Sequence, residues 1–359
     1  MKSTVDAKAF AAALKKVSGL LKPSMVPQLA EVHAAFTGKT CRLTASDLTA
    51  WFSIEIPAEG DSFELVFSNT KAVARASTHF NGHMTMELTG PDKTLTISCG
   101  AKSGEFSTLD TDLFPETPSF EPTERYPIRI NELYERIKRI SYASGIIEKH
   151  PAAAGVRFQG DNLWCIDGKR IAVQEDSSLT VTEPFILKAE SLAYLRDFNK
   201  CRGEMAVGRD HVAFKSRNLL LTIRRMKESD GLQIERFIPK DATESYLVDC
   251  KTYLDAINYL RDCGGAAGHA KIIFAAGNLV LEGKNGKYRA TVIRDADCKV
   301  PYACELSHLR EALRQFDGRR QVRISTVSSK DPIVLTDNYG GTALIMPLEL
   351  SGEEKSKAA

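Results

Sequence analysis

An internal repeat constrains the fold of this chain more than any other feature. The order helix, strands, helix, strands occurs three times along the sequence, with a period of roughly 120 residues. Within each repeat the two helices start about 60 residues apart, so each repeat itself consists of two similar halves. The strands come as hairpins rather than as strand–helix–strand crossovers. The repeat therefore predicts an α+β architecture of three similar domains, each with two helices packed on antiparallel sheets.

The helices of this repeat are predicted from apolar residues that recur at helical spacing. We expect them over 6–21, 68–79, 130–145, 188–201, 250–262 and 305–317. Ser68 is the expected N-cap of the second helix. The polar, Pro-rich stretch 114–122 is typical of a linker. We therefore expect domains over 1–118, 123–243 and 244–350, followed by a small, charged and disordered tail at 351–359.

A hairpin near the middle of the chain, at 163–173, has the strongest turn signal. Its Asp167-Gly168 pair supplies positive φ at low steric cost, which favours a tight turn between two strands. Related turns are expected at 43–47 and at 281–285, at the same place in the other two repeats. The central hairpin is therefore one of three equivalent turns.

Length and composition indicate a globular protein of several domains. A chain of 359 residues is too long for one ordinary core, and 43% hydrophobic with 26% charged residues is typical of a soluble chain. No apolar run approaches a membrane span, and the first residues form no hydrophobic signal region. The eight cysteines stand alone, without a Cys-x-x-Cys pair, which favours reduced, buried thiols over disulfides or zinc. We expect a cytoplasmic protein with no membrane contact.

No residue pattern indicates catalysis. The stretch Thr37-Gly38-Lys39-Thr40 resembles the end of a phosphate loop, but the earlier Gly is absent and the segment joins two strands. The seven His are scattered, with no spacing that binds a metal. No combination of nucleophile, base and orienting group emerges. We expect a binding protein without catalytic residues, metal or cofactor.

Most of the six helices place Lys and Arg on the side away from the apolar stripe. One interpretation is that these are ordinary solvated helix faces. The other is that the helices gather their cations on a concave surface that contacts DNA phosphates, since sequence-independent DNA binding consists of such contacts. The two interpretations stay open on composition alone. The candidate residues are Lys15, Lys16, Lys71, Arg75, Arg136, Lys138, Arg139, Arg196, Lys200, Arg310 and Arg314.

Four segments, in this order on a triple repeat, resemble the bacterial DNA polymerase III β subunit, the sliding clamp. They are Phe106–Leu109 with Phe114-Pro115, Ile166–Val173, Arg236–Lys240 and Ala343–Leu350. None is decisive singly, but together they are specific. The resemblance covers essentially the whole chain apart from 351–359.

The resemblance implies three clamp domains per chain and two chains head to tail in a closed ring. The helices would line the hole and the sheets would form the outer wall. Such a ring is a DNA polymerase processivity factor that encircles duplex DNA and is held by topology, because phosphate contacts are sequence-blind and individually weak. Implied partners are a second copy, double-stranded DNA, an ATP-driven clamp loader, the replicative polymerase and other proteins with a clamp-binding motif. A clamp-fold peptide scaffold that does not encircle DNA is the alternative.

The resemblance also assigns residues. Lys22 lies in the loop where clamps have a basic DNA-contacting residue, and the ring interface would join Phe106 to the region of Tyr259 and Leu260. Partner peptides would enter an apolar cleft between the second and third domains, where an aromatic or aliphatic anchor provides affinity. Its residues would be Ala153, Ile166, Gly168, Lys169, Arg170, Ile171, Leu232, Arg236, Phe237, Pro332, Leu344, Ile345, Met346, Pro347 and Leu348.

The chain departs from the usual clamp pattern at the expected cleft. Ala153 stands where clamps usually have a larger apolar residue, and Ile166, Lys169 and Leu232 replace a frequent Thr, His and Pro. The sequence pI is about 8.0, whereas clamps are usually acidic. These differences bear on partner specificity more than on the fold. Of the three turns, only the central one is followed by Arg-Ile-Ala-Val, which we expect to pair with 344–348 and form the docking site.

Overall fold

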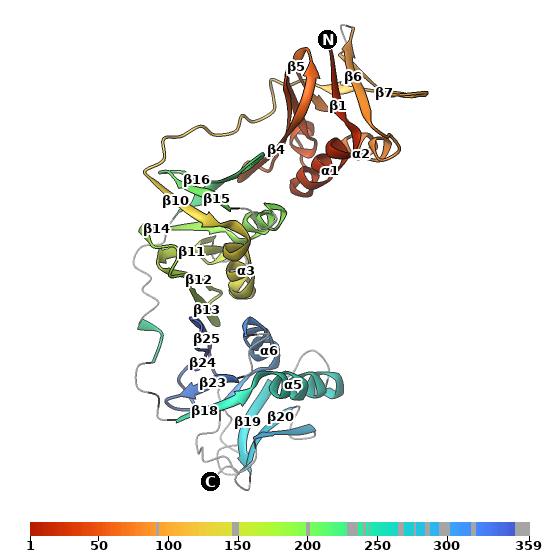
Figure 1. Ribbon diagram of the computed structural model, residues 1–359. Helices are drawn as coiled ribbons and strands as arrows, with labels where there is room; N and C mark the ends of the chain where they lie inside the picture. Colours follow the sequence, from red (N-terminus) through yellow and green to blue (C-terminus); the bar gives the residue numbers. More distant parts are fainter. Residues whose placement is uncertain are drawn as a thin grey trace. The chain divides into compact units, whose positions relative to one another are not determined.

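The structure is a computed structural model, which describes most of the chain in two compact units (Figure 1). The described residues are 1–90, 93–145, 151–198, 202–227, 236–239, 242, 244–264, 269–275, 278–283, 288–293, 302–316 and 321–348. The first unit is Met1–Tyr134 with Glu190–Arg225, and the second is Glu135–Ala189 with Met226–Ala359. The expected tail at 351–359 lies outside the described residues.

The first unit contains the N-terminal helices and two antiparallel strand systems. Its helices are α1 (Ala7–Val17), α2 (Thr70–Ser77) and most of α4 (Ala189–Leu192), with 3-10 turns η1 (Ser18–Leu20), η2 (Pro27–Ala30) and η5 (Ala193–Phe198). Its strands are β1 (Lys2–Asp6), β2 (His33–Thr37), β3 (Thr40–Ser46), β4 (Ala50–Gly60), β5 (Ser62–Phe67), β6 (His83–Thr89), β7 (Thr94–Cys99), β8 (Lys102–Phe106), β9 (Thr108–Leu109), β10 (Glu124–Arg129), β15 (Arg202–Val207), β16 (His211–Ser216) and most of β17 (Leu219–Met226).

The second unit contains the rest, and α3 (Ile130–Ile140) spans the division. Its other helices are α5 (Cys250–Gly264) and α6 (Leu306–Gln315), with 3-10 turns η3 (Ser141–Ala143) and η4 (Pro151–Ala154). Its strands are β11 (Gly155–Gly160), β12 (Asn162–Ile166), β13 (Arg170–Glu175), β14 (Val181–Lys188), β18 (Glu244–Asp249), β19 (His269–Ala275), β20 (Asn278–Gly283), β21 (Tyr288–Ile293), β22 (Tyr302–Glu305), β23 (Gln321–Thr326), β24 (Ile333–Thr336) and β25 (Gly341–Ile345).

Strand pairing builds the same arrangement in both units. The first unit contains the antiparallel run β5-β2-β3-β4-β17-β16-β15-β10. The second contains the run β14-β11-β12-β13-β25-β24-β23-β18. In each run the middle contact joins strands from two successive repeats. We name the contact of β4 with β17 the first joint and the contact of β13 with β25 the second joint.

The remaining strands are half-domains of the same kind. At the N-terminal end, β1 pairs with β6, β6 with β7 and β7 with β8, which is the order found in β10-β15-β16-β17 and β18-β23-β24-β25. At the C-terminal end, the 4-stranded sheet β21-β20-β19-β22 has the order of β4-β3-β2-β5. The structure thus confirms the α+β class, the antiparallel sheets and the threefold repeat.

Helix boundaries differ from the expected ones for local reasons. α1 begins after Asp6, whose Oδ1 accepts from the N–H of Ala9 at 2.8 Å, and its last turn tightens into η1. The cap of α2 is Asn69, not Ser68, because Asn69 Oδ1 accepts from Ala72 N–H while the Ser68 hydroxyl donates to the carbonyl of Ser107 at 2.7 Å. The helix expected over 188–201 is only α4 and η5.

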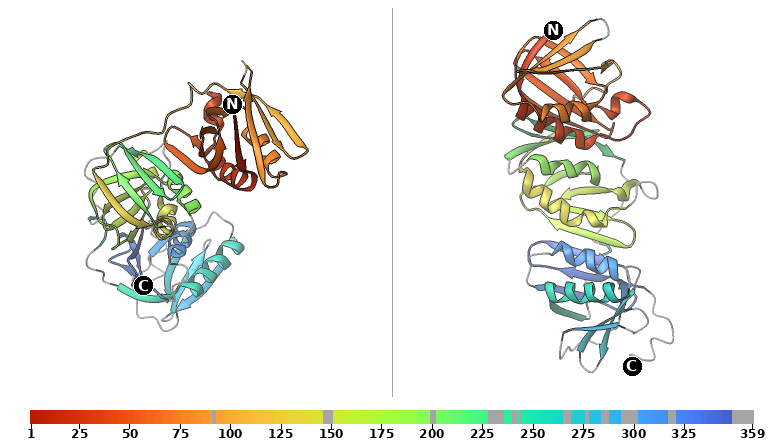
Figure 2. Two further views of the ribbon diagram at one scale, coloured as in Figure 1. Left: turned by 45° about the horizontal axis from the view of Figure 1, so that its top comes forward. Right: turned by 90° about the vertical axis from the view of Figure 1, so that its right-hand side faces the viewer.

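The helices lie on one face of the sheets in each unit. Figure 2 shows α5 and α6 side by side over the sheet of the second unit, and α1 packs on α2 in the first. Their inward residues, such as Phe10, Leu14, Tyr253 and Leu309, are fully buried. Four of the described cysteines, Cys41, Cys165, Cys250 and Cys304, are buried, as expected. None of the described helices combines the length and apolarity needed to cross a bilayer.

Candidate functional site

The second joint carries an apolar cluster on the face of the sheet away from α3 and α6. The buried members are Trp164, Ile171, Val173, Val334 and Leu344, with Ile166 and Ile238 packed against them. Alternation along each strand brings them to one face. Ile171 lies opposite Leu344 in the register, so the strand after the central hairpin does pair with the C-terminal strand as expected. We name this set, together with exposed Met346 and Phe237, the docking patch.

The exposed part of the docking patch lies at its edges. Met346 is 48% exposed and Phe237 is 43% exposed, although both are large apolar side chains. The Met346 N–H donates to the carbonyl of Lys169 at 2.9 Å, which fixes the backbone just beyond β25. Exposed large apolar groups beside a buried apolar floor are typical of an interaction surface.

The central hairpin holds this patch in place. Gly168 has φ +85°, and Asp167 Oδ1 accepts from the N–H groups of Lys169 and Arg170 at 2.9 and 2.7 Å. Lys169 reaches Glu305 with Nζ at 2.9 Å from a carboxylate oxygen, which ties the turn to the start of α6. The predicted Asp-Gly turn is therefore present and joined to the third repeat.

Arg170 is a structural residue in this arrangement. Its guanidinium contacts both Asp167 and Glu311, donates to the carbonyl of Tyr142 at 3.1 Å and lies over the Tyr142 ring. Burial alone would lower the pKa of Arg170, but the bonds to the two carboxylates outweigh burial and raise it. The side chain is only 11% exposed, so its groups are committed within the fold rather than to a ligand.

The other residues expected in the cleft divide into four groups. Ile166, Ile171 and Leu344 lie in the docking patch. Ile345 instead points into the main core of the third repeat, where it is fully buried. Leu232 lies outside the described residues. Those at the ends of neighbouring segments, half-buried or exposed, are Ala153, Gly168, Arg236, Pro332, Pro347 and Leu348.

Sequence reasoning missed four members of the patch: Trp164, Val173, Val334 and Ile238. Trp164 and Ile166 alternate along β12, and Ile171 and Val173 alternate along β13. This period of two was a usable signal for one apolar face. The contribution of Val334 and Ile238 depends on tertiary pairing, which local spacing does not reveal.

Some of the cations expected to contact DNA are already paired with acids. Lys22 Nζ lies 3.3 Å from Asp47 and 3.2 Å from Glu190. Burial alone would lower the pKa of Lys22, but these carboxylates outweigh it and raise the pKa. Arg136 lies 3.0 Å from Asp176, which is almost fully buried. Arg136 therefore neutralises an internal carboxylate.

Other cations remain exposed. In the first unit Lys15, Lys71 and Arg75 are exposed, and among the described residues no carboxylate pairs with them. Lys16 donates to the carbonyl of Asp197 at 3.4 Å, and Arg196 lies 3.7 Å from the Asp197 carboxylate. Lys200 lies outside the described residues.

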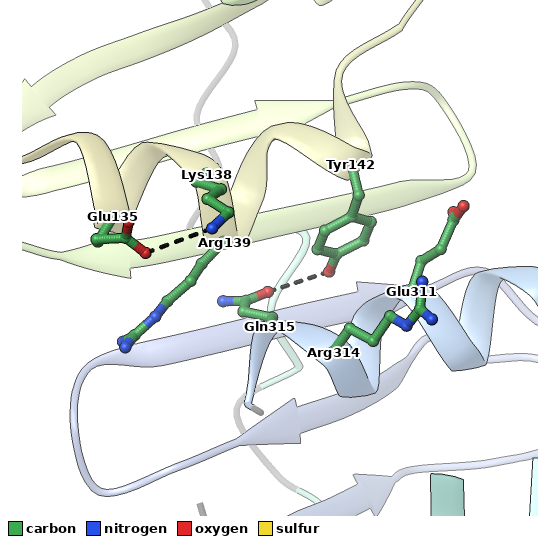
Figure 3. A pocket seen from close by; sticks show the side chains of 7 residues that line it. All are labelled: Glu135, Lys138, Arg139, Tyr142, Glu311, Arg314 and Gln315. Carbon is green, nitrogen blue, oxygen red and sulfur yellow. Dashed lines mark hydrogen bonds and ion pairs between the residues drawn. The ribbon is translucent and has the colours of Figure 1, made fainter. Parts of the chain in front are cut away.

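In the second unit a basic pocket lies between α3 and α6. Its volume is about 450 Å³ and its cations are Lys138, Arg139 and Arg314 (Figure 3). Glu135 pairs with Lys138 at 3.7 Å, while Arg139 and Arg314 have no carboxylate within ion-pair distance among the residues described. Arg310 donates to Asn258 at 2.9 Å at the side of this group. The pocket suits an anion such as a phosphate.

Two side chains fix the floor of this basic pocket. Tyr142 O–H donates to Gln315 Oε1 at 3.0 Å, as Figure 3 shows. Gln315 Nε2 in turn donates to the carbonyl of Val173 at 2.8 Å and, more weakly, to that of Thr342 at 3.4 Å. The Gln315 amide on α6 thus connects η3, which follows α3, to both strands of the second joint.

The residues expected at the ring interface differ in exposure. Tyr259 is 50% exposed on the outer side of α5. Leu260 is 2% exposed because it packs in the core of its own repeat. Its contribution to an interface would be indirect. Phe106 ends β8, where it lies opposite Leu95 in the pairing with β7.

No family model and no curated protein matches this sequence. Solved structures do match the fold. The DNA polymerase sliding clamp of Bacillus subtilis has 17% identity and a TM-score of 0.87, with coverage of 98% of this chain and 99% of that one. The DNA polymerase III subunit beta of Pseudomonas aeruginosa has 17% identity and a TM-score of 0.86 (98% and 100%). The beta sliding clamp of C. crescentus has 18% identity and a TM-score of 0.88 (98% and 99%). The chain therefore has the sliding-clamp fold over nearly its whole length.

Proposed function

We propose that this chain is the sliding clamp of a DNA polymerase. Two copies form a head-to-tail ring around duplex DNA, and the docking patch tethers a polymerase and other partners by a short peptide. An ATP-driven loader, as a separate protein, opens and closes the ring. The role is that of a non-catalytic processivity factor, which the likeness to solved clamps over 98% of the chain supports.

The observation that best supports a ring is that the first and last repeats each end in a strand with one edge unpaired among the described pairings. In the described pairings β8 has only β7 as a neighbour, and β21 has only β20. β8 holds the place that β17 and β25 hold at the two joints, and β21 holds the place of β4 and β13. When β8 of one copy pairs with β21 of another, the same joint is made a third time. Two copies then close a ring.

The cations support the DNA-binding part of this proposal. Lys71 and Arg75 on α2 and Arg139 and Arg314 beside the basic pocket remain available after the internal ion pairs have formed. Phosphate contacts of this kind bind DNA without reading its sequence. This is the chemistry that a mobile ring requires.

The docking patch supports the tethering part. Its buried floor is apolar, and Met346 and Phe237 leave apolar surface exposed beside it. A short peptide gains most of its affinity from one or two aromatic or aliphatic anchors in such a place. The partners we infer are therefore flexible segments with apolar anchors, as in the clamp-binding motifs of replication proteins.

A disulfide across the proposed ring contact tests the assembly. Residues opposite one another on antiparallel strands lie about 4.5–5.5 Å apart, which a disulfide spans. Ser103→Cys on β8 is combined with Arg289→Cys or with Ala290→Cys on β21, in a Cys263→Ser background. We expect one of the two pairs, and neither single variant, to give a covalent dimer under mild oxidation. A chain that sediments as a monomer and forms no covalent dimer with either pair contradicts the ring.

A further inference from the structure

The first joint repeats the second residue by residue. At the first joint Trp51 lies opposite Thr222, and at the second Ile171 lies opposite Leu344. A backbone hydrogen bond just beyond the paired strands is also present at both joints. Arg224 N–H donates to the carbonyl of Thr49 at 2.8 Å, as the Met346 N–H does to that of Lys169 at 2.9 Å. Corresponding positions in the two joints can therefore be compared directly.

The two joints differ in the chemistry of these corresponding positions. The docking patch has Trp164, Ile166, Val173, Val334 and Leu344. The first joint has in their places Thr44, Ser46, Ser53, Ala213 and Thr222. The four hydroxyl residues among them are buried, and the Thr44 and Ser53 hydroxyls are 2.9 Å apart. At these five positions the first joint is thus small and mostly polar, where the second is large and apolar. At the sixth position the first joint has buried Trp51 in the place of Ile171.

An aromatic residue of the linker is connected to the first joint through His211. Phe120 stacks on His211 with ring centroids 6.1 Å apart, and His211 meets the buried ring of Trp51 edge-on at 5.8 Å. The Arg224 guanidinium lies 5.9 Å from the centre of the Trp51 ring. These contacts form one continuous row from the linker to the joint.

Gly208 provides the seat for the linker ring. A Cβ placed on Gly208 would lie 2.3 Å from a ring carbon of Phe120. Gly208 is not among the glycines with positive φ, so the backbone itself does not require glycine there. Just beyond Phe120, Thr123 N–H donates to the carbonyl of Val207 at 2.7 Å and pins the linker beside this seat. The absence of a side chain at Gly208 therefore serves the contact with Phe120.

We propose that the linker segment 119–122 is the resident occupant of the first joint, in the position where the second joint receives a partner's peptide. Phe120 is its anchor, and Gly208, His211 and Trp51 form its receptor. The first joint is thereby withheld from other peptides, and it takes an aromatic-bearing peptide when Phe120 is displaced. The comparison with a partner's peptide rests on the function proposed above, whereas the occupancy rests on the contacts of the first unit.

The two tryptophans of the chain allow a direct test, because Trp51 lies at the first joint and Trp164 lies in the docking patch beside the second. In full-length protein with Trp164→Phe, Trp51 fluorescence reports the first joint alone. The probe is a synthetic peptide with the sequence of residues 116–124, and the matched probe has Ala in place of Phe120. We expect the first probe to bind Phe120→Ala protein saturably, at least about tenfold more tightly than protein that keeps Phe120. The matched probe should not bind.

A second variant keeps the test decisive if Phe120→Ala does not fold. Gly208→Ala removes the seat while leaving Phe120 in the chain, and we expect the same opening to the probe. Phe237→Ala, at the exposed edge of the docking patch, should leave the Trp51 signal unchanged. The proposal is overturned if the probe binds the Phe120→Ala or Gly208→Ala variant no more tightly than it binds protein that keeps both residues. It is also overturned if the probe binds neither variant.

The same fluorescence separates this proposal from the proposed function. A polymerase-derived peptide that binds the docking patch changes the signal of Trp164, in protein with Trp51→Phe. Failure of that peptide counts against the tethering function and leaves the result at Trp51 standing. Failure of the linker probe with normal binding at Trp164 counts against the resident linker alone.

Discussion

Individual residues decide which cations are left for DNA. Lys22 and Arg136 both belonged to the set expected to contact DNA, and both are held by carboxylates far away in the sequence. Removing one partner of a buried ion pair leaves an uncompensated charge, so the pair with Asp176 is worth keeping for the fold alone. Sequence spacing cannot reveal such partners. Sequence spacing could reveal that Lys71 and Arg75 lie one turn apart on the same helix face.

Met346 provides the sharpest single-residue test of the docking patch. Its side chain is 48% exposed and its backbone bond does not depend on the side chain, so Met346→Ala should leave the thermal unfolding temperature nearly unchanged. Loss of an apolar anchor should weaken the binding of a polymerase-derived peptide by about tenfold, or about 1.4 kcal/mol. Fluorescence anisotropy of a labelled peptide measures this. Leu113→Ala, which removes an apolar side chain that is 63% exposed just before the linker, is the control. Equal affinities for both variants would remove Met346 from the site.

Three histidines make stability depend on pH. Burial lowers the pKa of His33, His211 and His308 below the usual 6.5. The unfolded chain therefore binds more protons than the folded chain as pH falls through that value. Stability should be fully present above about pH 6.5 and should decline as the pH falls below that value. Urea unfolding at several pH values checks the slope, which should be reduced in His308→Gln. A free energy of unfolding that rises on acidification would contradict the assignment.

At the scale of elements, the joint between repeats is the unit of construction. The central Asp-Gly turn was predictable, because turn residues are a local signal. The pairing of its exit strand with the C-terminal strand was expected only from the resemblance to sliding clamps, because local spacing does not reveal tertiary pairing. The ends of the helices were harder to predict from the sequence. Ser68 and Asn69 can both cap α2, and the choice is made by a hydrogen bond from the Ser68 hydroxyl to the carbonyl of Ser107, between β8 and β9. The edge strands β10 and β18 owe their place to pairing with β15 and β23.

Gln315 tests how far the second joint depends on α6. Gln315→Leu keeps the apolar bulk but leaves the Val173 carbonyl and the Tyr142 hydroxyl without their partner. We expect a loss of about 2 kcal/mol of unfolding free energy and weaker peptide binding, because β13 and β25 shape the docking patch. Tyr142→Phe removes one of these bonds and should lose about 1 kcal/mol. Urea unfolding of both variants gives the comparison. An unchanged Gln315→Leu protein would mean that the joint is independent of the helix.

At the scale of the whole molecule, the repeat turns two exposed strand edges into an assembly rule. An exposed antiparallel edge such as β8 is usually protected, because it is a template for pairing with another chain. A head-to-tail contact uses both edges and leaves none open in a closed ring. The residues of β8 and β21 alone did not suggest this, and it became visible only when their places were compared with those at the two internal joints.

The salt dependence of DNA binding tests the role of the exposed helix cations. Log affinity for duplex DNA falls with log salt by about 0.9 per phosphate contact. Lys71→Gln with Arg75→Gln should reduce the slope by about 1.8 if both residues contact phosphates. Arg42→Gln with Lys215→Gln changes the same charge on strands β3 and β16 and should leave the slope as it is. Equal slopes in both double variants would favour ordinary solvated helix faces.

Retention on circular DNA tests the central proposal most directly. The protein is loaded onto nicked circular DNA with a clamp loader, separated from free protein, and the DNA is then cut at one site. A ring held by topology stays on the intact circle and slides off the ends of the cut molecule, with little dependence on sequence. We predict that cutting releases most of the bound protein. Retention that is unchanged by linearisation would contradict a ring around DNA and would favour a peptide-binding scaffold with the clamp fold.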